Sequence, residues 1–404
     1  MPENFHIDMP EAVRNIIHTI EEHGFKAYAV GGCIRDSILG RNPDDWDITT
    51  SAVPSQIKTF FKRTVDTGIA HGTVTIMIDK TGYEVTTYRI DGEYEDGRHP
   101  KSVEFSDRLV DDLCRRDFTI NAMAYNDTDG FVDEFKGLDD LDTKIIRCVG
   151  EPELRFTEDA LRMMRAIRFS AQLGFTIDEA TWNAIKKLSP SISKISMERV
   201  HVELGKTLMS AHPDYVAQYS EAGLFAPILP VIDNALKSRY KRKILATLQH
   251  TPDNIYLRYA ALFITSTPDE AAKTLRALKL DNKTVNTVSK LVELSKMDIE
   301  ETEPAVRTAL NKYGRDFLPL WHELMMAVIQ ASEDITGISN PAKVKHLLTL
   351  KRLGTDILAR GDCFTIKDLD ISGNDLIEYG LQGHEIGETL KSLLDIVIEN
   401  PKLN

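Results

Sequence analysis

The sequence predicts an α+β fold in which an N-terminal domain, built on a small mixed β-sheet flanked by helices, is followed by an all-α remainder. Three observations lead to this prediction. An apolar run, a glycine pair and a helical repeat follow one another across residues 28–39, which indicates strand, turn and helix. Strand-like runs recur at 74–77 and 83–88. From about residue 151 onward, helical spacing of apolar residues replaces strand-like alternation.

The length of 404 residues permits two to four domains of about 100–200 residues each, and an apolar content of 42% can fill their cores. Pro213, Pro227 and Pro230 interrupt the helical pattern and favour a boundary near residue 212. We expect four domains, which we name the head at 1–148, the neck at 149–212, the body at 213–300 and the tail at 301–404.

The charge balance and the cysteines limit the class of protein. With 49 basic and 62 acidic side chains the net charge is −13, so an RNA site should be a local basic patch on an acidic body. No apolar run approaches about 18 residues and no export signal is visible, so we expect a cytoplasmic protein without a membrane partner. The four cysteines lack the spacing of zinc ligands and are expected to be reduced thiols: Cys33, Cys114, Cys148 and Cys363.

The segment from Tyr28 to Asp36 has the features of an anion-binding turn. Gly31 and Gly32 let the backbone come close to a phosphate, and the helix start behind them offers unpaired N–H groups beside Arg35. Taken alone, however, a pair of glycines is usually an ordinary turn.

Two carboxylates follow this turn. Asp45 and Asp47 are separated by one residue, so on a strand both point to the same face, and Trp46 and Ile48 favour a strand here. Taken alone, an Asp-x-Asp sequence is more often a solvated loop. Beside a phosphate site the pair suggests Mg²⁺ ligands, and hence phosphoryl or nucleotidyl transfer.

These residues together resemble the signature of a known family. Val30-Gly-Gly-x-x-Arg-Asp36, Gly40-Arg41 and Asp45-x-Asp47 resemble the head-domain motif of class II tRNA nucleotidyltransferases, the CCA-adding enzymes, and of bacterial poly(A) polymerases. The resemblance continues through about residue 205. It implies an enzyme that adds C, C and A to the 3′ end of tRNA from CTP and ATP and releases pyrophosphate. Asp45 and Asp47 would be its catalytic Mg²⁺ ligands.

Glu84 lies in the strand-like run 83–88. An acid in such a run can equally be a charge that protects an edge strand from unwanted pairing. The resemblance implies instead a third active-site carboxylate on the strand after the aspartate pair. Glu84 therefore joins Asp45 and Asp47 as a catalytic candidate.

Residues 91–100 are charged, contain two glycines and lack periodicity, so we expect a mobile loop. The resemblance suggests that this loop helps to switch the site from adding C to adding A, through contacts of Glu93, Asp96 or Arg98. The loop also speaks against a CC-only enzyme, because such relatives tend to lack it.

The triplet Arg115-Arg116-Asp117 would, standing alone, favour a salt-bridged helix surface. It lies within a stretch that resembles the family motif Asp-Leu-x-x-Arg-Asp-Phe-Thr-x-Asn-Ala. The resemblance implies that Arg116 contacts the nucleotide and that Asp117 works with it to recognise the ribose.

Thr157, followed by two acids, predicts the start of a helix. Along it Arg162, Arg165 and Arg168 recur every three residues. Such a stripe is normally a solvated face, and Glu158 could pair with Arg162. The later arginines lack an acid among their following neighbours, so the three could also grip a triphosphate or RNA phosphates. The family motif Glu-Asp-x-x-Arg matches this stretch.

Base choice must come from protein side chains, because nothing in the sequence can serve as a template. Cytosine and adenine present an amino donor next to a ring-nitrogen acceptor, whereas uracil and guanine present a carbonyl next to a ring N–H. Asp159 set beside Arg162 would accept from the first group and donate to the second. These two residues are the candidate base-selecting pair.

Ser196-Met-Glu-Arg199 resembles the neck motif of the family, in which Glu198 and Arg199 would support the structure. Basic segments interleaved with apolar residues follow later in the chain. They are ordinarily helix surfaces, but at least one is expected to contact tRNA phosphates: 237–243, 275–280 and 343–352.

Rival functions stay open at this point. A bacterial poly(A) polymerase or an A-adding enzyme would share the head, and a CC-adding enzyme is a further relative. A non-catalytic RNA-binding protein would not need Asp45, Asp47 and Glu84 together. The sequence leaves monomer and homodimer equally open.

Overall fold

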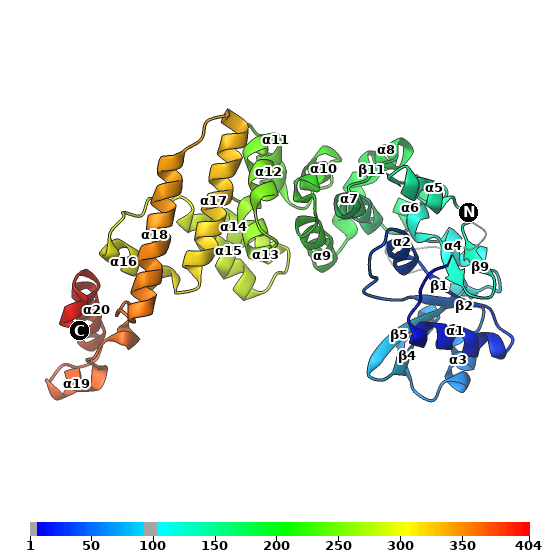
Figure 1. The fold of residues 1–404 in the computed structure, drawn as a ribbon, viewed down its shortest axis with the longest axis horizontal. Coiled ribbons are helices and arrows are strands. Elements are labelled where there is room, and N and C mark those ends of the chain that lie inside the picture. Colours follow the sequence, from blue (N-terminus) through cyan, green and yellow to red (C-terminus); the bar gives the residue numbers. More distant parts are fainter. Residues whose placement is uncertain (1–5, 93–102) are drawn as a thin grey trace. The chain divides into compact units, whose positions relative to one another are not determined.

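The computed structural model describes residues 6–92 and 103–404 (Figure 1). Glu93, Asp96 and Arg98 of the expected mobile loop lie outside the described residues. The chain forms two compact units, which we call the N-terminal unit (1–211 with 218–228) and the C-terminal unit (212–217 with 229–404). The boundaries of the four smaller domains stay a prediction.

Among the described residues, the N-terminal unit contains a seven-stranded sheet in the order β3-β4-β5-β2-β1-β8-β9. Neighbouring strands are antiparallel except β2 and β5, which are parallel, so the sheet is mixed. The strands are β1 (Ala27–Val30), β2 (Ile48–Thr50), β3 (Thr64–Gly68), β4 (Thr73–Ile78), β5 (Thr81–Thr87), β8 (Ala124–Asn126) and β9 (Gly130–Val132). This sheet and the helical remainder confirm the predicted α+β fold.

Helices and shorter elements accompany the sheet. The first helix packs on it through Val13, Ile16, Ile17 and Ile20, which are all buried and recur with helical spacing. The accompanying elements are α1 (Glu11–Glu22), α2 (Gly32–Ile38), α3 (Pro54–Phe60), α4 (Leu109–Cys114), α5 (Gly137–Asp142), and the two-stranded ribbon of β6 (Arg89–Asp91) and β7 (Val103–Phe105).

Helices dominate the rest of the N-terminal unit. They are α6 (Pro152–Glu158), α7 (Leu161–Leu173), α8 (Glu179–Leu188), α9 (Met197–Leu208) and α10 (Val216–Glu221), the last of which runs from one unit into the other. A two-residue parallel pair, β10 (Ile145–Ile146) with β11 (Thr176–Ile177), lies among them. Short 3₁₀ helices in the chain are η1 (Ile69–His71), η2 (Thr119–Asn121), η3 (Ser189–Lys194), η4 (Pro213–Tyr215), η5 (Ile366–Asp368) and η6 (Pro401–Leu403).

The prediction that a helix begins at Thr157 is wrong. Thr157 lies near the end of α6, where its hydroxyl donates to the backbone carbonyl of Glu153 at 2.7 Å. Pro152 fits the first turn of a helix and begins α6 earlier. Asp159 then breaks the run with an extended backbone, and its carboxylate accepts from the N–H of Leu161 at 3.0 Å, where α7 begins.

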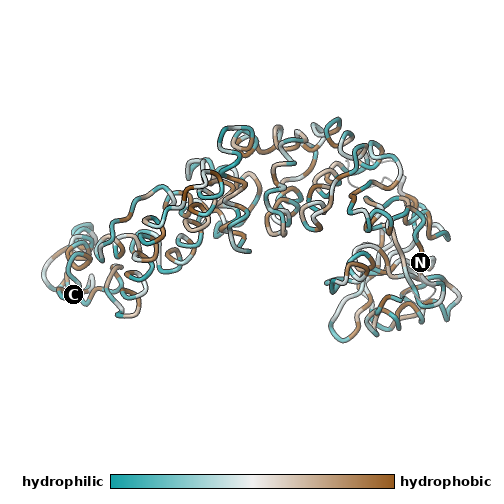
Figure 2. Tube along the Cα trace, turned by 45° about the horizontal axis from the view of Figure 1, so that its top comes forward, coloured by the Kyte–Doolittle hydropathy of each residue, from teal (hydrophilic) through white to brown (hydrophobic). Residues whose placement is uncertain are grey.

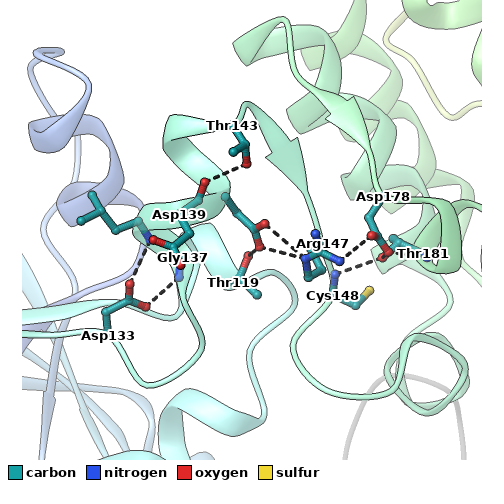
Figure 3. Close-up of polar contacts among 11 residues, drawn as sticks. Thr119, Asp133, Gly137, Asp139, Thr143, Arg147, Cys148, Asp178 and Thr181 are labelled. Atoms are coloured by element: carbon teal, nitrogen blue, oxygen red, sulfur yellow. Dashed lines mark hydrogen bonds and ion pairs between the residues drawn. The ribbon is translucent and has the colours of Figure 1, made fainter.

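Arg147 ties the sheet-bearing part of this unit to the helices that follow. Its Nε donates to Asp140 of α5 at 3.2 Å, and its Nη1 donates to Asp178, the residue that caps α8 (Figure 3). Close by, the N–H of Cys148 donates to Thr181 Oγ1 at 3.2 Å. These contacts join α5 and the segment after β10 to the start of α8, the helix that packs against α6.

The C-terminal unit is a helical array. The indole N–H of Trp321 donates to the carbonyl of Leu294 at 3.2 Å and joins α17 to the end of α15. The helices are α11 (Pro230–Lys237), α12 (Lys241–His250), α13 (Ile255–Leu262), α14 (Pro268–Ala277), α15 (Asn282–Leu294), α16 (Glu303–Tyr313), α17 (Phe317–Thr336), α18 (Pro341–Arg360), α19 (Gly373–Glu378) and α20 (His384–Glu399).

Two positions hold this array together. At Gly354 of α18 an added Cβ would lie 1.9 Å from Leu318 Cδ2, so the close approach of α17 and α18 requires a glycine. Arg307 of α16 is buried and bonds Asp362 at 2.9 Å and the carbonyl of Ile398 in α20 at 2.7 Å. A buried arginine with these partners fixes the C-terminal helix against α16.

Apolar and polar residues alternate along most of the chain trace (Figure 2). This alternation is typical of helices that bury one face. Within the described ranges, no helix combines the length and the apolar character needed to cross a membrane.

Candidate active site

The turn after β1 has the close packing that its glycines suggest. Gly31 has φ 87° and ψ −130°, and its N–H donates to the carbonyl of Met123 at 3.1 Å. A Cβ at this position would lie 3.0 Å from Arg116 Nη1. The positive φ therefore favours glycine here, and a larger residue would also have to displace the end of the Arg116 side chain. Gly32 begins α2 directly behind it.

Asp45 and Asp47 lie in the segment that leads into β2. Trp46 between them is buried at 9% exposure while both aspartates are exposed, so the two carboxylates lie on the same side. The N–H of Val30 donates to the carbonyl of Asp47 at 3.0 Å, which extends the pairing of β1 and β2. The aspartate pair is thereby held beside the glycine turn.

Glu84 is placed next to this pair by the parallel pairing of β2 and β5. Because Ile48 lies beside Val85, the preceding residues Asp47 and Glu84 are neighbours on one face. Loss of contact with water raises the pKa of Glu84, and the charges of Asp47 and Asp45 raise that pKa further. The three carboxylates thus form one electrostatic cluster.

The pKa of Asp47 is also raised. Although Asp47 is exposed as a whole residue, neighbouring atoms shield its carboxylate from water, and this shielding is the main cause; Asp45 adds to it, and the guanidinium of Arg116 opposes it. Carboxylates that repel one another beside a single arginine are suited to bind a cation.

The donor set fits a divalent ion that shares its ligands with a substrate. Among residues 6–92 and 103–404, no three Asp, Glu, His or Cys side chains form a ready-made metal site. Mg²⁺, however, is usually held by one or two carboxylates together with substrate phosphates and water. Asp45 and Asp47 supply that number of carboxylate ligands.

The raised pKa of Asp47 leads to a stability prediction for the metal-free protein. Its ionised form is less favourable in the folded than in the unfolded state, so this group destabilises the fold once the pH is above its raised pKa. Asp47→Asn should therefore raise the melting temperature at pH 7 in EDTA. This gain in melting temperature should shrink as the pH falls toward 3.8, the ordinary pKa of an aspartate carboxyl. Thermal scans against the exposed neighbour variant Asp44→Asn would show this, and an unchanged or lower melting temperature at pH 7 would contradict it.

Arg116 is oriented by a residue that the sequence reasoning missed. Asp112 of α4 is fully buried and accepts from Arg116 Nη2 at 3.0 Å, Arg115 Nη2 at 2.6 Å and Thr49 Oγ1 at 3.1 Å. These contacts hold the pKa of Asp112 below its usual value in spite of burial. The signal in the sequence was an acid followed at three and four residues by arginines.

Asp117 lies at the centre of a second group of contacts. It accepts from the N–H of Phe118 at 2.9 Å, from Asn121 Nδ2 at 3.0 Å and from Arg165 Nε at 2.7 Å. The pKa of its carboxyl lies well below the usual range because Arg165 and Asn121 outweigh the effect of burial. Asp117 therefore joins the segment after α4 to α7.

Arg35 and Arg168 meet at the ring of Phe169. Their guanidinium carbons lie 5.0 and 3.9 Å from the ring centroid. Arg168 also pairs with Glu203 of α9 at 2.7 Å. The acidic partners of Arg165 and Arg168 are thus Asp117 and Glu203, which lie outside α7, so helical spacing along α7 could not reveal them.

The expected base-selecting residues each bond a third group. Asp159 accepts two bonds from Arg199, at 2.7 and 3.1 Å. Arg162 pairs with Glu158 at 2.5 Å and donates to the backbone carbonyl of Arg115 at 2.9 Å. The pairing of Glu158 with Arg162, which the sequence left open as an alternative, is therefore present. Arg199 donates directly to the Asp159 carboxylate.

Comparison with known proteins finds three family models that match successive parts of the chain. Residues 27–147 match the model of the poly A polymerase head domain, and residues 174–236 match the probable RNA and SrmB-binding site of polymerase A. Residues 253–403 match tRNA nucleotidyltransferase domain 2. The CCA-adding enzyme of Pediococcus pentosaceus is 34% identical over 412 residues, covering 100% of this chain and 96% of the relative.

The chain belongs to the family of CCA-adding enzymes. The CCA-adding enzyme of Lactobacillus helveticus agrees, at 35% identity over 99% of this chain and 94% of the relative. The crystal structure of the Bacillus stearothermophilus CCA-adding enzyme in complex with CTP is 32% identical, with a TM-score of 0.74 over 96% of this chain and 92% of that one. A Thermotoga maritima CCA-adding enzyme complexed with tRNA shares the fold, at 21% identity and a TM-score of 0.60.

Membership of the CCA-adding family confirms the resemblance inferred from the glycine turn and the Asp-x-Asp pair. It also makes the protein a nucleotidyltransferase. The roles of individual residues stay predictions. The structure places all the predicted active-site residues in the N-terminal unit, with Arg35 and Arg116 beside the turn at Gly31 and Gly32. It adds four residues that sequence reasoning did not single out: Asp112, Asn121, Phe169 and Glu203.

Proposed function

We propose that this protein adds C, C and A in turn to the 3′ end of tRNA, using CTP and ATP and releasing pyrophosphate at each step. The observation that carries the proposal is the carboxylate cluster of Asp45, Asp47 and Glu84 beside the glycine turn in a member of the CCA-adding family. Nucleotidyl transfer needs such a cluster next to a phosphate site.

Asp45 and Asp47 would hold Mg²⁺, and Glu84 would support the same site. When bound, the ion stabilises the negative charge that develops on the transferring phosphoryl group. The chain itself supplies the turn at Gly31 and Gly32, where the backbone can approach a phosphate closely.

The nucleotide would be gripped by guanidinium groups that already lie around the turn. Arg35, Arg116, Arg165 and Arg168 come from α2, from the segment after α4 and from α7, and Asp117 holds one of them. Arginine suits this task because its planar donors match phosphate oxygens in pairs. In this proposal Asp117 positions Arg165 through their hydrogen bond. The family resemblance adds a second proposed role for Asp117, which is to help recognise the ribose.

Asp159 and Arg162 would select the base. A carboxylate has about four acceptor sites, so Asp159 can keep both bonds from Arg199 and the bond from the Leu161 N–H and still accept one from the amino group of cytosine or adenine. Arg162 would donate to the ring nitrogen. Uracil and guanine would place a carbonyl against Asp159 and an N–H against Arg162, and both contacts are repulsive.

A poly(A) polymerase or an A-adding enzyme is the second candidate, because residues 27–147 match the poly A polymerase head domain. Transfer assays separate the candidates. A tRNA that lacks its last three nucleotides should gain two residues from CTP alone, and tRNA ending in CC should gain one residue from ATP alone. UTP and GTP should give no product. Repeated addition from ATP alone would favour the polymerase, and addition only to CC-ended tRNA would favour the A-adding enzyme.

The tRNA would also contact the C-terminal unit. Lys243 of α12 and Lys343 of α18, from two of the predicted basic segments, line one cavity of about 540 Å³ beside Trp321 and Met297. Two exposed lysines from different helices that meet in this way can reach neighbouring phosphates.

Replacing both lysines should weaken tRNA binding without changing the KM for CTP. We expect Lys243→Glu with Lys343→Glu to lower the tRNA affinity at least tenfold and to reduce its salt dependence by about one unit of slope for each lost phosphate contact. Lys283→Glu, at the other end of α15 from Met297, is the matched control. Equal affinity of the double variant and the control in a salt titration would remove the lysines from the tRNA site.

We place this activity in the cytoplasm, where tRNA and both nucleotides are available. Whether the active form is a monomer or a homodimer would follow from the mass of the protein in solution with and without tRNA.

A further inference from the structure

Asn121 lies at the end of η2, only 6% exposed, between the glycine-turn helix α2 and the neck helix α7. We infer that its amide is a positioning group, which fixes Arg35 of α2 relative to Arg165 of α7 and thereby sets the affinity for the nucleotide triphosphate. This inference rests on the proposed function of the site. It assigns Asn121 no contact with the substrate.

The amide connects the two arginines through a continuous chain of hydrogen bonds. Its Oδ1 accepts from Arg35 Nη1 at 2.6 Å, and its Nδ2 donates to Asp117 Oδ1 at 3.0 Å. The other oxygen of Asp117 accepts from Arg165 Nε at 2.7 Å. The amide has only one favourable orientation, in which its carbonyl faces a guanidinium and its amino group faces a carboxylate. A flipped amide would set donor against donor at Arg35 and acceptor against acceptor at Asp117.

A second path joins the same arginines through an aromatic ring. The guanidinium carbons of Arg35 and Arg165 lie 5.0 and 5.4 Å from the centroid of Phe169. The ring keeps both guanidinium groups close to itself, but it does not determine how each planar group is turned. The hydrogen bonds of Asn121 and Asp117 supply that orientation, which matters because guanidinium binds phosphate in a fixed geometry.

Loss of the amide should loosen this arrangement without dismantling it. Arg35 keeps its paired bonds to Asp36, at 2.8 and 2.9 Å, and Arg165 keeps Asp117. Both arginines would therefore remain near the site but turn more freely. The nucleotide would then have to order them on binding, which raises KM, while the carboxylates that carry the chemistry are untouched.

Asn121→Ala should raise the KM for CTP on tRNA lacking its last three nucleotides, and the KM for ATP on tRNA ending in CC, by a similar factor of roughly tenfold. The equal factor is expected because both nucleotides share the triphosphate. The kcat at saturating nucleotide should change less than twofold. The ratio of CTP to UTP incorporation should stay as in the wild type.

Asn126→Ala is the matched control. Asn126 is a fully buried amide of β8 in the same unit, and its Nδ2 donates to Glu21 and to the carbonyl of Ala27 at 3.0 Å each. It contacts neither Arg35 nor Arg165. Its removal should lower the melting temperature as the Asn121 variant does, yet leave both KM values within twofold of the wild type.

A second variant keeps the test decisive if Asn121→Ala does not fold. Asn121→Asp retains an acceptor for Arg35 but replaces the donor to Asp117 with a negative charge, so it should also raise both KM values. KM values within twofold of the control in every folded variant would overturn the positioning role. The same KM rise in Asn126→Ala would also overturn it. An inactive wild type would instead contradict the proposed function itself, so the two failures are distinguishable.

Discussion

Asp47→Asn is expected to reduce nucleotide addition by roughly a thousandfold or more while tRNA still binds with its normal affinity. An amide is a poor ligand for Mg²⁺ compared with a carboxylate, and Asp47 interacts electrostatically with both other members of the cluster, Asp45 and Glu84. Loss of charge stabilisation on the phosphoryl group costs several kcal/mol of barrier, which is the source of the expected factor. Asp45→Asn should behave alike.

Single-turnover incorporation of CTP measures this effect, with tRNA affinity determined separately by fluorescence anisotropy. Asp44→Asn is the control, because Asp44 is an exposed acid in the same segment that carries no assigned role. Turnover by Asp47→Asn within about tenfold of the Asp44 variant would show that the metal is not held there.

Arg162→Ala should relax base choice and leave the chemistry itself possible. The donor that opposes a ring N–H would be missing, so the preference for CTP over UTP should fall by about 10- to 100-fold, which corresponds to about 1–3 kcal/mol. The expected change lies mainly in faster incorporation of UTP, because in the proposed mechanism the wild-type side chains reject UTP by repulsion.

Arg162 also contributes to stability through its contacts with Glu158 and the carbonyl of Arg115. The control variant must therefore lose similar structural contacts without removing the proposed base contact. Arg155 pairs with the same Glu158 at 2.6 Å and donates to the carbonyl of Cys114 at 3.1 Å, next to the carbonyl of Arg115 that Arg162 uses. Arg155→Ala should therefore cost stability and keep base choice. If the two variants show the same CTP to UTP ratio, base selection resides elsewhere.

The carboxylate cluster of Asp45, Asp47 and Glu84 could be predicted only in part from the sequence. Alternation around Trp46 correctly places Asp45 and Asp47 on one face. The neighbourhood of Glu84 was inferred from the family, because the parallel pairing of β2 and β5 joins strands that are separated by β3 and β4 in the chain. Local periodicity carries no information about such pairing.

The arginine contacts were the least predictable part. The stripe on α7 is visible in the sequence, but its partners Asp117 and Glu203 come from distant segments. The start of the helix was misplaced at Thr157, because a Thr followed by acids matches a capping pattern while Pro152 begins a separate helix earlier. Arg199 was expected only to support the neck, whereas it bonds Asp159, the carboxylate that we propose selects the base.

Selection of C, C and A without a template is tested most directly by offering the wild-type protein all four nucleotides at once. The substrate is tRNA that lacks its last three nucleotides, with Mg²⁺ present, and the 3′ ends of the products are sequenced. Ends that read CCA and grow no further are the predicted result. Ends that carry U or G, or long runs of A, would contradict it.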